Sequence, residues 1–131
     1  MKLLIAGSRT LCPSVEEIDK HLAEWRKLFT KAGIPWWQEI DVLVSGGARG
    51  VDAHGEQWAR EKGILIERHP ADWKRWGRRA GYVRNRTMAE SCALGLIFWD
   101  GKSAGTGNMI DLLGEVGRPA RIVPMHPRGI Q

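Results

Sequence analysis

Three glycine-rich segments of this sequence each follow an apolar run and combine glycine with hydroxyl or cationic side chains. Glycine allows positive φ angles and lets backbone N–H groups approach an anion closely, and a following helix adds its dipole. The expected ligand-binding residues in these segments are Gly7, Ser8 and Arg9; Gly46, Gly47, Ala48, Arg49, Gly50 and Asp52; and Gly105, Thr106, Gly107 and Asn108. A single such segment is often only a tight turn, but three together predict a shared phosphate or ribose site.

Two further groups of residues are candidates for the same site. Asp52 falls in the first turn of a predicted helix, where it either complements the helix dipole or accepts from ribose hydroxyls or a base edge. Asp72 and Trp73 lie close together, and an indole stacks on a base while a carboxylate accepts from it. Alternatively, Trp73 and Trp76 cover the core beneath a long loop.

Arg84, Asn85 and Arg86 lie near the start of another predicted helix. Residues two apart on a helix point in different directions, so at most one of the two arginines faces the site. An arginine fork suits a phosphate, and a solvated charged face is the alternative interpretation.

Several common site chemistries are disfavoured by the spacing. The segment Gly46–Asp52 lacks the Gly-Lys-Ser/Thr ending of a Walker A motif, and Gly-x-Gly-x-x-Gly does not follow the first apolar run. The histidines are scattered, and Cys12 and Cys92 lack CxxC spacing, so we expect neither a metal nor a disulfide framework. We identify no cofactor, and we expect a nucleotide-like ligand.

Short apolar runs that continue without polar interruption are typical of strands buried on both faces of a sheet. They predict strands at Leu3–Ala6, Val42–Ser45, Ile64–Ile66, Leu94–Trp99 and Arg121–Val123. Alternation of these strands with helices predicts a Rossmann-like α/β fold, a doubly wound and mostly parallel sheet of about five strands with helices on both faces. The 131 residues suit one domain over 1–131, with its ligand outside the carboxyl ends of the strands.

Helices are predicted between these strands. The first starts at Pro13-Ser14, where Ser14 and Glu17 are spaced as a capping box, and it stops at Gly33 and Pro35. The others are predicted over Val51–Lys62, ended by Gly63, over Gly81–Ser91, and from beyond the loop Gly101–Gly107 to about Glu115. Ala71–Arg79 is predicted to be a basic aromatic loop, and the tail from Pro124 is predicted to be irregular.

The formal net charge of +5 favours a polyanionic or phosphorylated partner. The basic segment Lys74–Arg86 interleaves with Trp73, Trp76 and Tyr82, a composition that suits stacking on single-stranded bases. Nucleic acid is therefore a further candidate partner, ranked below a small nucleotide derivative because the glycine segments already account for phosphate-seeking chemistry.

No apolar run approaches the roughly 18 residues that span a membrane, and the run after Met1 is too short for a signal peptide. We therefore expect a cytoplasmic protein with no membrane partner.

Trp36 and Trp37 follow the first predicted helix, where paired exposed indoles suit an interface in a homo-oligomer, although capping of the core is the alternative.

As a set, the motifs resemble the YspA-related branch of the SLOG superfamily, which joins DprA-type DNA-processing proteins with LOG-type phosphoribohydrolases. The resemblance runs from Leu3 to about Val123, on Ile5–Arg9, Val44–Asp52, Ala71–Trp73, Gly81 with Arg84–Met88, and Phe98–Gly101 followed by Gly105-Thr106. It implies a Rossmannoid fold that binds nucleotides or nucleotide-derived ligands, in some relatives ADP-ribose-like signalling molecules. It also implies that Gly105 and Thr106 hold a phosphate and that Arg84, or Arg86 in another register, matches the arginine of the LOG-type Arg-Lys-x-x-Met segment.

One departure from the LOG-type pattern bears on catalysis. Those enzymes carry Pro-Gly-Gly-x-Gly-Thr-x-x-Glu, in which the glutamate assists N-glycosidic bond cleavage. The glutamate position here is Met109, which can neither accept a proton nor stabilise an oxocarbenium ion. Asp111 lies two residues further on and points about 200° away on a helix, so it is a poor substitute.

Three functions remain open on this basis. The leading one is a sensor or sequestering module for a nucleotide derivative. The second is hydrolysis of a nucleoside monophosphate at its N-glycosidic bond, with Asp52, Asp72 or Asp111 as the carboxylate and Arg84 or Arg86 as the phosphate clamp. The third is DprA-like binding of single-stranded nucleic acid.

Overall fold

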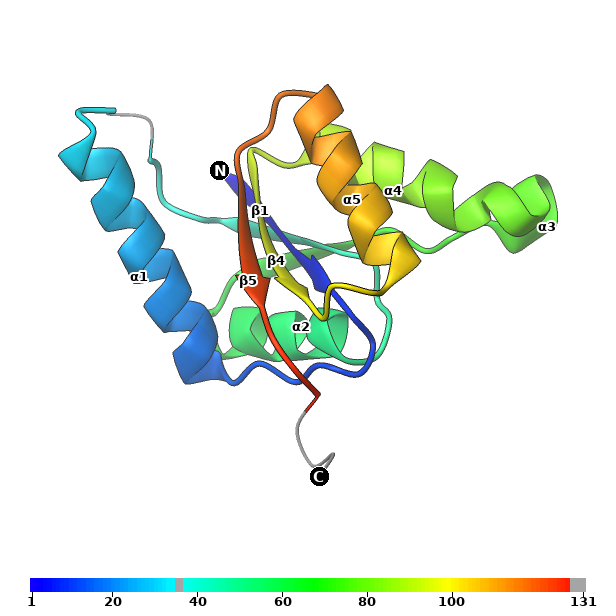
Figure 1. The fold of residues 1–131 in the computed structure, drawn as a ribbon, viewed down its shortest axis with the longest axis horizontal. Helices are drawn as coiled ribbons and strands as arrows, with labels where there is room; N and C mark the ends of the chain where they lie inside the picture. Colours follow the sequence, from blue (N-terminus) through cyan, green and yellow to red (C-terminus); the bar gives the residue numbers. More distant parts are fainter. Residues whose placement is uncertain (35–36, 128–131) are drawn as a thin grey trace.

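In a computed structural model, which describes residues 1–34 and 37–127, strands and helices alternate along the chain (Figure 1). The strands are β1 (Lys2–Gly7), β2 (Val42–Ser45), β3 (Leu65–Arg68), β4 (Leu94–Trp99) and β5 (Ala120–Pro124). The helices are α1 (Val15–Lys31), α2 (Val51–Lys62), α3 (Trp73–Trp76), the 3-10 helix η1 (Gly77–Arg79), α4 (Ala80–Ser91) and α5 (Ala104–Glu115).

The five strands form one parallel sheet in the order β3-β2-β1-β4-β5. β1 pairs with β4 from Leu3 opposite Leu94 to Gly7 opposite Phe98, so both strands end at the same edge. The chain runs outward from β1 through β2 to β3 and then crosses to β4 on the other side. The strand order therefore reverses between β1 and β4, the place where ligands bind in open α/β sheets. The predicted Rossmann-like α/β class is confirmed.

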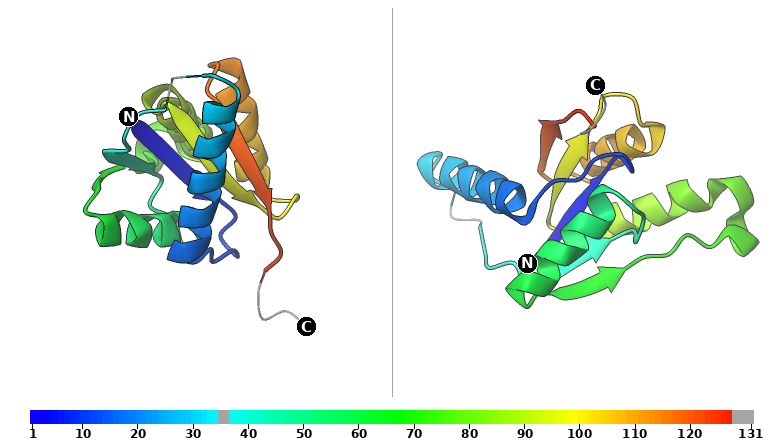
Figure 2. Two further views of the ribbon diagram at one scale, coloured as in Figure 1. Left: turned by 90° about the vertical axis from the view of Figure 1, so that its left-hand side faces the viewer. Right: turned by 90° about the horizontal axis from the view of Figure 1, so that it is seen from below.

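Helices cover both faces of the sheet, with α1 and α2 on one and α4 and α5 on the other (Figures 1 and 2). Successive strand residues point to opposite faces, so β1 contributes to two separate cores. Leu3 and Ile5 pack with α1 and α2, whereas Leu4 and Ala6 pack with α4 and α5. Cys92 is buried in the second core.

The ends of the first two long helices follow the predicted local signals. The Ser14 hydroxyl accepts from the Glu17 N–H at 3.1 Å, and the Glu17 carboxylate accepts from the Ser14 N–H at 3.2 Å. This reciprocal pair satisfies two N-terminal donors of α1 and confirms the capping box. Gly63 ends α2 in the left-handed conformation at φ 69°, as glycine does at many helix ends.

Two predictions about loops are wrong. Ala71–Arg79 contains α3 and η1 and is not a loop. The Asp72 carboxylate accepts from the Arg75 N–H at 3.1 Å and starts a helix that is too short to show a periodic pattern in the sequence. Gly105, Thr106 and Gly107 lie inside α5, which begins at Ala104 and not beyond the glycines. The glycines are accommodated there because α5 packs on the sheet through buried residues such as Met109 and Leu113.

Smaller differences concern the edges of the sheet. β3 runs over Leu65–Arg68, two residues beyond the predicted end, and Pro124 is the last residue of β5 and not the first of the tail. Both are edge strands with exposed residues, and they contain polar or charged residues that a continuous apolar run does not mark.

The predicted tryptophan interface falls partly outside the described residues, because Trp36 is not among them. Trp37 packs against the core through Trp25 and Phe29, with ring centroids 5.9 and 5.6 Å apart, which matches the capping alternative for this residue.

Among the described helices, none is both long and apolar enough to cross a bilayer. Within 1–34 and 37–127, His, Cys, Asp and Glu side chains form no group of three that could hold a metal ion.

Candidate functional site

A cavity of about 330 Å³ lies at the carboxyl ends of β1 and β4, where the strand order reverses. Its size falls at the lower end of the range for small-molecule sites. Nine of the residues expected from the sequence line it: Gly7, Ser8, Arg9, Ala48, Asp52, Arg84, Asn85, Gly105 and Thr106. All three glycine segments, together with α4, therefore contribute to one cavity.

The remaining candidates do not line this cavity. They are Gly46, Gly47, Arg49, Gly50, Asp72, Trp73, Arg86, Gly107, Asn108 and Asp111. Arg86 lies on the exposed side of α4, where it pairs with Glu90 and Glu115 at 3.3 Å each. Asp111 is exposed on α5, so of the three aspartates named from the sequence as candidate carboxylates only Asp52 lies in the cavity wall.

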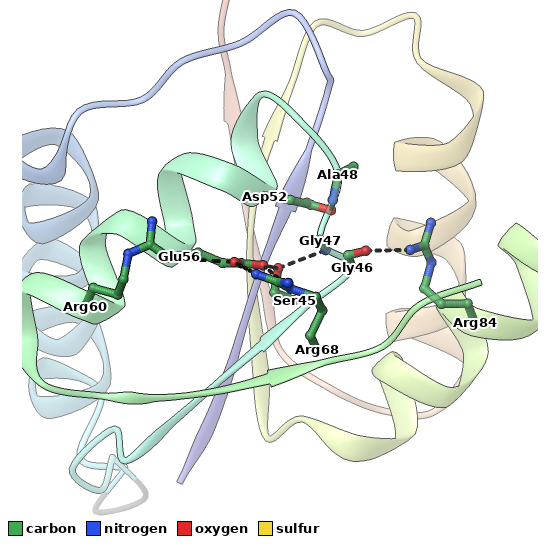
Figure 3. A network of polar contacts seen from close by, with 9 residues as sticks. All are labelled: Ser45, Gly46, Gly47, Ala48, Asp52, Glu56, Arg60, Arg68 and Arg84. Atoms are coloured by element: carbon green, nitrogen blue, oxygen red, sulfur yellow. Dashed lines mark hydrogen bonds and ion pairs between the residues drawn. The ribbon is translucent and has the colours of Figure 1, made fainter. Parts of the chain in front are cut away.

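The turn after β2 already uses its own amides, as Figure 3 shows. The Gly47 N–H donates to the Ser45 hydroxyl at 3.1 Å, and the Ala48 N–H donates to the Asp52 carboxylate at 3.1 Å. These two N–H groups already donate within the protein, so they are not free to donate to an anion. The glycines of this turn serve close packing instead, since a Cβ at Gly50 would lie 2.3 Å from the Arg9 carbonyl oxygen.

An ionic network around the buried carboxylate of Glu56 lies beside this turn (Figure 3). Glu56 of α2 accepts from the Ser45 hydroxyl at 2.7 Å and from Arg68 Nε at 3.1 Å, and Arg68 Nη2 also contacts it. Burial opposes ionisation of Glu56, but the hydrogen bonds from Arg68 and Ser45 outweigh it, so the pKa of Glu56 is lowered. The carboxylate stays charged and ties α2, β2 and β3 together behind the site.

Asp52 is the buried carboxyl group of the cavity wall. It is only 7% exposed, and this burial raises its pKa to about 6, although the Ala48 N–H and the charge of Arg84 act in the opposite direction. Asp52 therefore exchanges a proton close to neutral pH. In either state it offers a carbonyl-type oxygen that accepts a hydroxyl donor.

Arg84 reaches from α4 to the opposite side of the cavity. Its Nη1 donates to the Gly46 carbonyl at 2.9 Å (Figure 3). The same nitrogen donates to the His69 carbonyl at 3.4 Å, and the two bonds fix the guanidinium in place. A side chain at Gly46 would collide with this group, because a Cβ there would lie 2.8 Å from Arg84 Nη1. Among the described residues, Arg84 Nε is buried without a hydrogen-bond partner.

Two residues that the sequence analysis left out of the site organise its α5 side. Asp100 accepts from the Lys102 and Ser103 N–H groups at 2.8 Å each, and Ser103 Oγ lies 2.9 Å from Ser8 Oγ. These backbone bonds, from Ser103 and Lys102, lower the pKa of Asp100 to about 2, so it is ionised throughout the physiological range. The spacing of Asp100 and Ser103 in a glycine-containing turn was the signal that could have found them.

The N-terminus of α5 opens onto the cavity without a side-chain cap. Ser103 occupies the capping position but makes no capping hydrogen bond, because its hydroxyl is directed to Asp100 and Ser8. Asn85, only 8% exposed, donates to the Gly105 carbonyl at 3.3 Å and to the Asn108 side chain at 3.1 Å. Gly105 and Thr106, in the first turn of α5, line the cavity, and the N-terminus of a helix is suited to bind an anion.

The residue at the LOG-type glutamate position also lines the cavity. Met109 is 2% exposed and belongs to the core between α5 and the sheet. A thioether there supplies an apolar floor and no acid or base.

Comparison with known proteins places the chain among relatives. The family model described as "YspA, cpYpsA-related SLOG family" matches residues 1–76. The "Gene 61 protein" of Mycobacterium phage D29 is 42% identical over 71 residues, which are 50% of this chain and 57% of that protein. The chain thus spans little more than half the length of this curated relative. No solved structure matches the chain.

Proposed function

Since the chain belongs to the YspA, cpYpsA-related SLOG family, we propose that it binds a nucleotide or nucleotide-derived ligand, as a sensor or sequestering module, in the cavity at the carboxyl ends of β1 and β4. The observation that carries this proposal is that one cavity is lined both by the uncapped N-terminus of a twelve-residue helix, α5, and by Arg84, whose guanidinium is fixed by two backbone carbonyls. A helix N-terminus and an arginine fork are both suited to a phosphate group.

The two sides of the cavity divide the expected contacts. The α5 side, with Gly105 and Thr106, offers amides, a hydroxyl and the helix dipole to the phosphate. The opposite side offers Asp52, whose carboxyl group suits the hydroxyls of a ribose. Because the Gly47 and Ala48 amides are engaged within the protein, we do not assign the phosphate to the turn after β2, which contributes Ala48 to the cavity wall.

Titration calorimetry with AMP, GMP, CMP, UMP and ADP-ribose tests this proposal. We expect at least one of these compounds to bind and to be recovered chemically intact. Arg84→Met should weaken that binding at least tenfold, whereas Arg86→Met, on the same helix but outside the cavity, should leave it unchanged. Absence of binding to all five compounds, or equal effects of the two variants, would contradict the proposal.

Hydrolysis of a nucleoside monophosphate is the second candidate, and the position of Asp52 favours it. A carboxyl group with a pKa of about 6 inside a cavity is suited to donate a proton to a leaving base. In that reaction the N-glycosidic bond breaks, water adds its oxygen to the ribose carbon, and the base leaves with a proton. Met109, in place of the LOG-type glutamate, weighs against this candidate.

Release of free base separates the two candidates. Prolonged incubation with each nucleoside monophosphate, followed by chromatography, should show no free base if the protein only binds its ligand. If base appears, Asp52→Asn should abolish its release while retaining binding, and Asp111→Asn, on the exposed side of α5, serves as the matched control.

A further inference from the structure

The amide group of Asn85 is held in a single orientation. A backbone carbonyl only accepts hydrogen bonds, so the Asn85 atom that lies 3.3 Å from the Gly105 carbonyl oxygen is the amide nitrogen, Nδ2. The same Nδ2 donates to Asn108 Oδ1 at 3.1 Å, and the two bonds use both of its hydrogens. The amide therefore cannot turn over, and its Oδ1 is an acceptor in a fixed position.

The oxygen of this amide is open to the cavity at the carboxyl ends of β1 and β4. Asn85 is only 8% exposed and is one of the residues that line this cavity. Among the described residues, no donor reaches its Oδ1, and this oxygen is not one of the fully enclosed polar atoms that lack a partner. A nearly buried acceptor of this kind favours a ligand that brings an N–H or O–H to it.

An apolar wall lies beside this acceptor. Met88 follows Asn85 by three positions in α4, so the two residues are neighbours on one face of the helix. Met88 and Met109 of α5 are both 2% exposed, and both line the cavity. Thioethers make favourable contacts with aromatic rings. The combination suits a planar base that carries an N–H group on its edge better than it suits a ribose hydroxyl.

We propose that Asn85 determines which bases the cavity accepts. Its Oδ1 accepts from an exocyclic amino group, so the cavity selects adenine or cytosine over hypoxanthine or uracil, which carry a carbonyl oxygen in the same place. That carbonyl would face Oδ1 as a second acceptor, and both oxygens would lose hydrogen bonds to water without a replacement. This inference rests on the proposed function, and it adds the property of the base that the site recognises.

Two pairs of nucleotides test this selection: AMP with IMP, and CMP with UMP. The members of a pair have nearly the same shape, but one has an amino group where the other has a carbonyl oxygen. Calorimetry measures the ratio of affinities within each pair. In the wild-type protein we expect the amino member of at least one pair to bind at least tenfold more tightly. Asn85→Leu removes the oxygen, keeps the approximate size of the side chain, and should reduce this ratio to below about twofold.

Asn108 supplies the matched control, because it shares a hydrogen bond with Asn85 but does not line the cavity. Asn108→Ala leaves the Asn85 amide held by the Gly105 carbonyl, so the ratio should be preserved. Thermal unfolding shows whether each variant is folded. If Asn85→Leu does not fold, Asn85→Ser takes its place, since the shorter serine side chain withdraws its oxygen from the position of Oδ1 and should also bring the ratio below about twofold.

The outcomes separate this inference from the proposed function. Wild-type ratios near one in both pairs, or tighter binding of the carbonyl members, overturn the selection alone. A ratio that survives the Asn85 substitution in a folded protein, or one that falls equally in Asn108→Ala, also overturns it. If ADP-ribose binds and none of the four nucleotides does, the proposed function stands and the selection fails. If none of these compounds binds, the proposed function fails together with the selection.

Discussion

The carbonyl oxygen of Phe98 lies directly over the α-carbon of Gly7, so that a Cβ at residue 7 would be only 2.1 Å away from it. Gly7 ends β1 and is paired with Phe98 of β4 across the sheet. The Ser8 N–H donates to the same oxygen at 3.2 Å, which holds the two strand ends together beneath the cavity. The first glycine segment is thus required by the packing of two strands, whatever ligand binds above it.

Replacement of Gly7 by alanine should therefore destabilise the fold. The added methyl group meets backbone, which cannot rotate away, so we expect a loss of about 1–3 kcal/mol of unfolding free energy, or more. Gly81→Ala is the control, since its methyl would meet only Trp73, at 3.9 Å. Urea titration of both variants measures the difference, and an effect of Gly7→Ala below about 0.5 kcal/mol would contradict the assignment.

Gly105 offers the opposite case, because nothing lies within 4 Å of a Cβ built on it. Alanine is a better helix former than glycine, so Gly105→Ala should raise the unfolding free energy by up to about 1 kcal/mol. The methyl group would also stand at the cavity wall, and nucleotide affinity should fall at least tenfold. Gly114→Ala, also in α5 and with open space, should stabilise the protein without changing affinity. Equal affinities of the two variants would place the phosphate away from α5.

The raised pKa of Asp52 predicts a pH dependence of stability. The folded state holds the proton up to a pH of about 6, whereas an unfolded aspartate releases it near 3.8. The stabilisation is therefore fully present below pH 3.8 and is lost as the pH rises through 6, and it amounts to about 3 kcal/mol for a pKa raised from 3.8 to about 6. Relative to Asp52→Asn, the wild-type protein should lose unfolding free energy between pH 4 and pH 7. A constant difference between the two proteins over this interval would show that Asp52 is ionised throughout.

Asp100 should act on ligand affinity through the turn before α5. Asp100→Ala removes the acceptor for the Lys102 and Ser103 N–H groups and frees Ser103 from its position beside Ser8. We expect roughly tenfold weaker nucleotide binding, the equivalent of about one hydrogen bond. Asp100→Asn retains an acceptor oxygen and should recover most of the affinity, as calorimetry would show. If both variants lost affinity equally, the negative charge of Asp100 and not its hydrogen bonds within the turn would be responsible for the effect.

The cations of α3 and η1 predict a weak, salt-sensitive association with single-stranded DNA. Among the described residues, Lys74, Arg75, Arg78 and Arg79 have no acidic partner within ion-pair distance, and Trp73 and Tyr82 are more than half exposed beside them. Four contacts to phosphates would give a slope of about −3 in log affinity against log salt. Binding should be lost near physiological salt and in the double variant Arg78→Gln/Arg79→Gln.

The matched control for this measurement replaces two exposed cations of α1, Lys27 and Lys31, by glutamine. It removes the same charge from another surface and should bind DNA like the wild-type protein. Tight binding that persists at physiological salt would instead support the nucleic-acid alternative over the small ligand.

Local signals were sufficient for most of the fold. The capping box of Ser14 and Glu17, the glycine end of α2 and the continuous apolar runs of β1 and β4 are all properties of neighbouring residues, and the structure confirms them. α3 escaped prediction because four residues are too few to show a helical period, and its start depends on one side-chain contact of Asp72.

The site was less predictable, because its chemistry depends on residues distant in the sequence. The glycines at 46, 47 and 50 indicate a phosphate loop by composition, but Ser45 and Asp52 take two of its amides and Arg84 fills the space above Gly46. Ser103 gained its role only through the approach of Ser8, ninety-five positions away along the chain. The arginine that faces the cavity could not be chosen from the spacing of Arg84 and Arg86 alone.

The Glu56 network beside the turn after β2 affects the rate at which a ligand binds. Since Ser45, Arg68 and Glu56 order this turn in the free protein, its conformational entropy is given up during folding and not during association. We expect this turn to keep its conformation when a ligand binds. The rate of association is then limited by diffusional encounter and by the loss of water from the cavity. Without Glu56 the turn would have to become ordered each time a ligand binds. The ligand would then associate more slowly and dissociate faster.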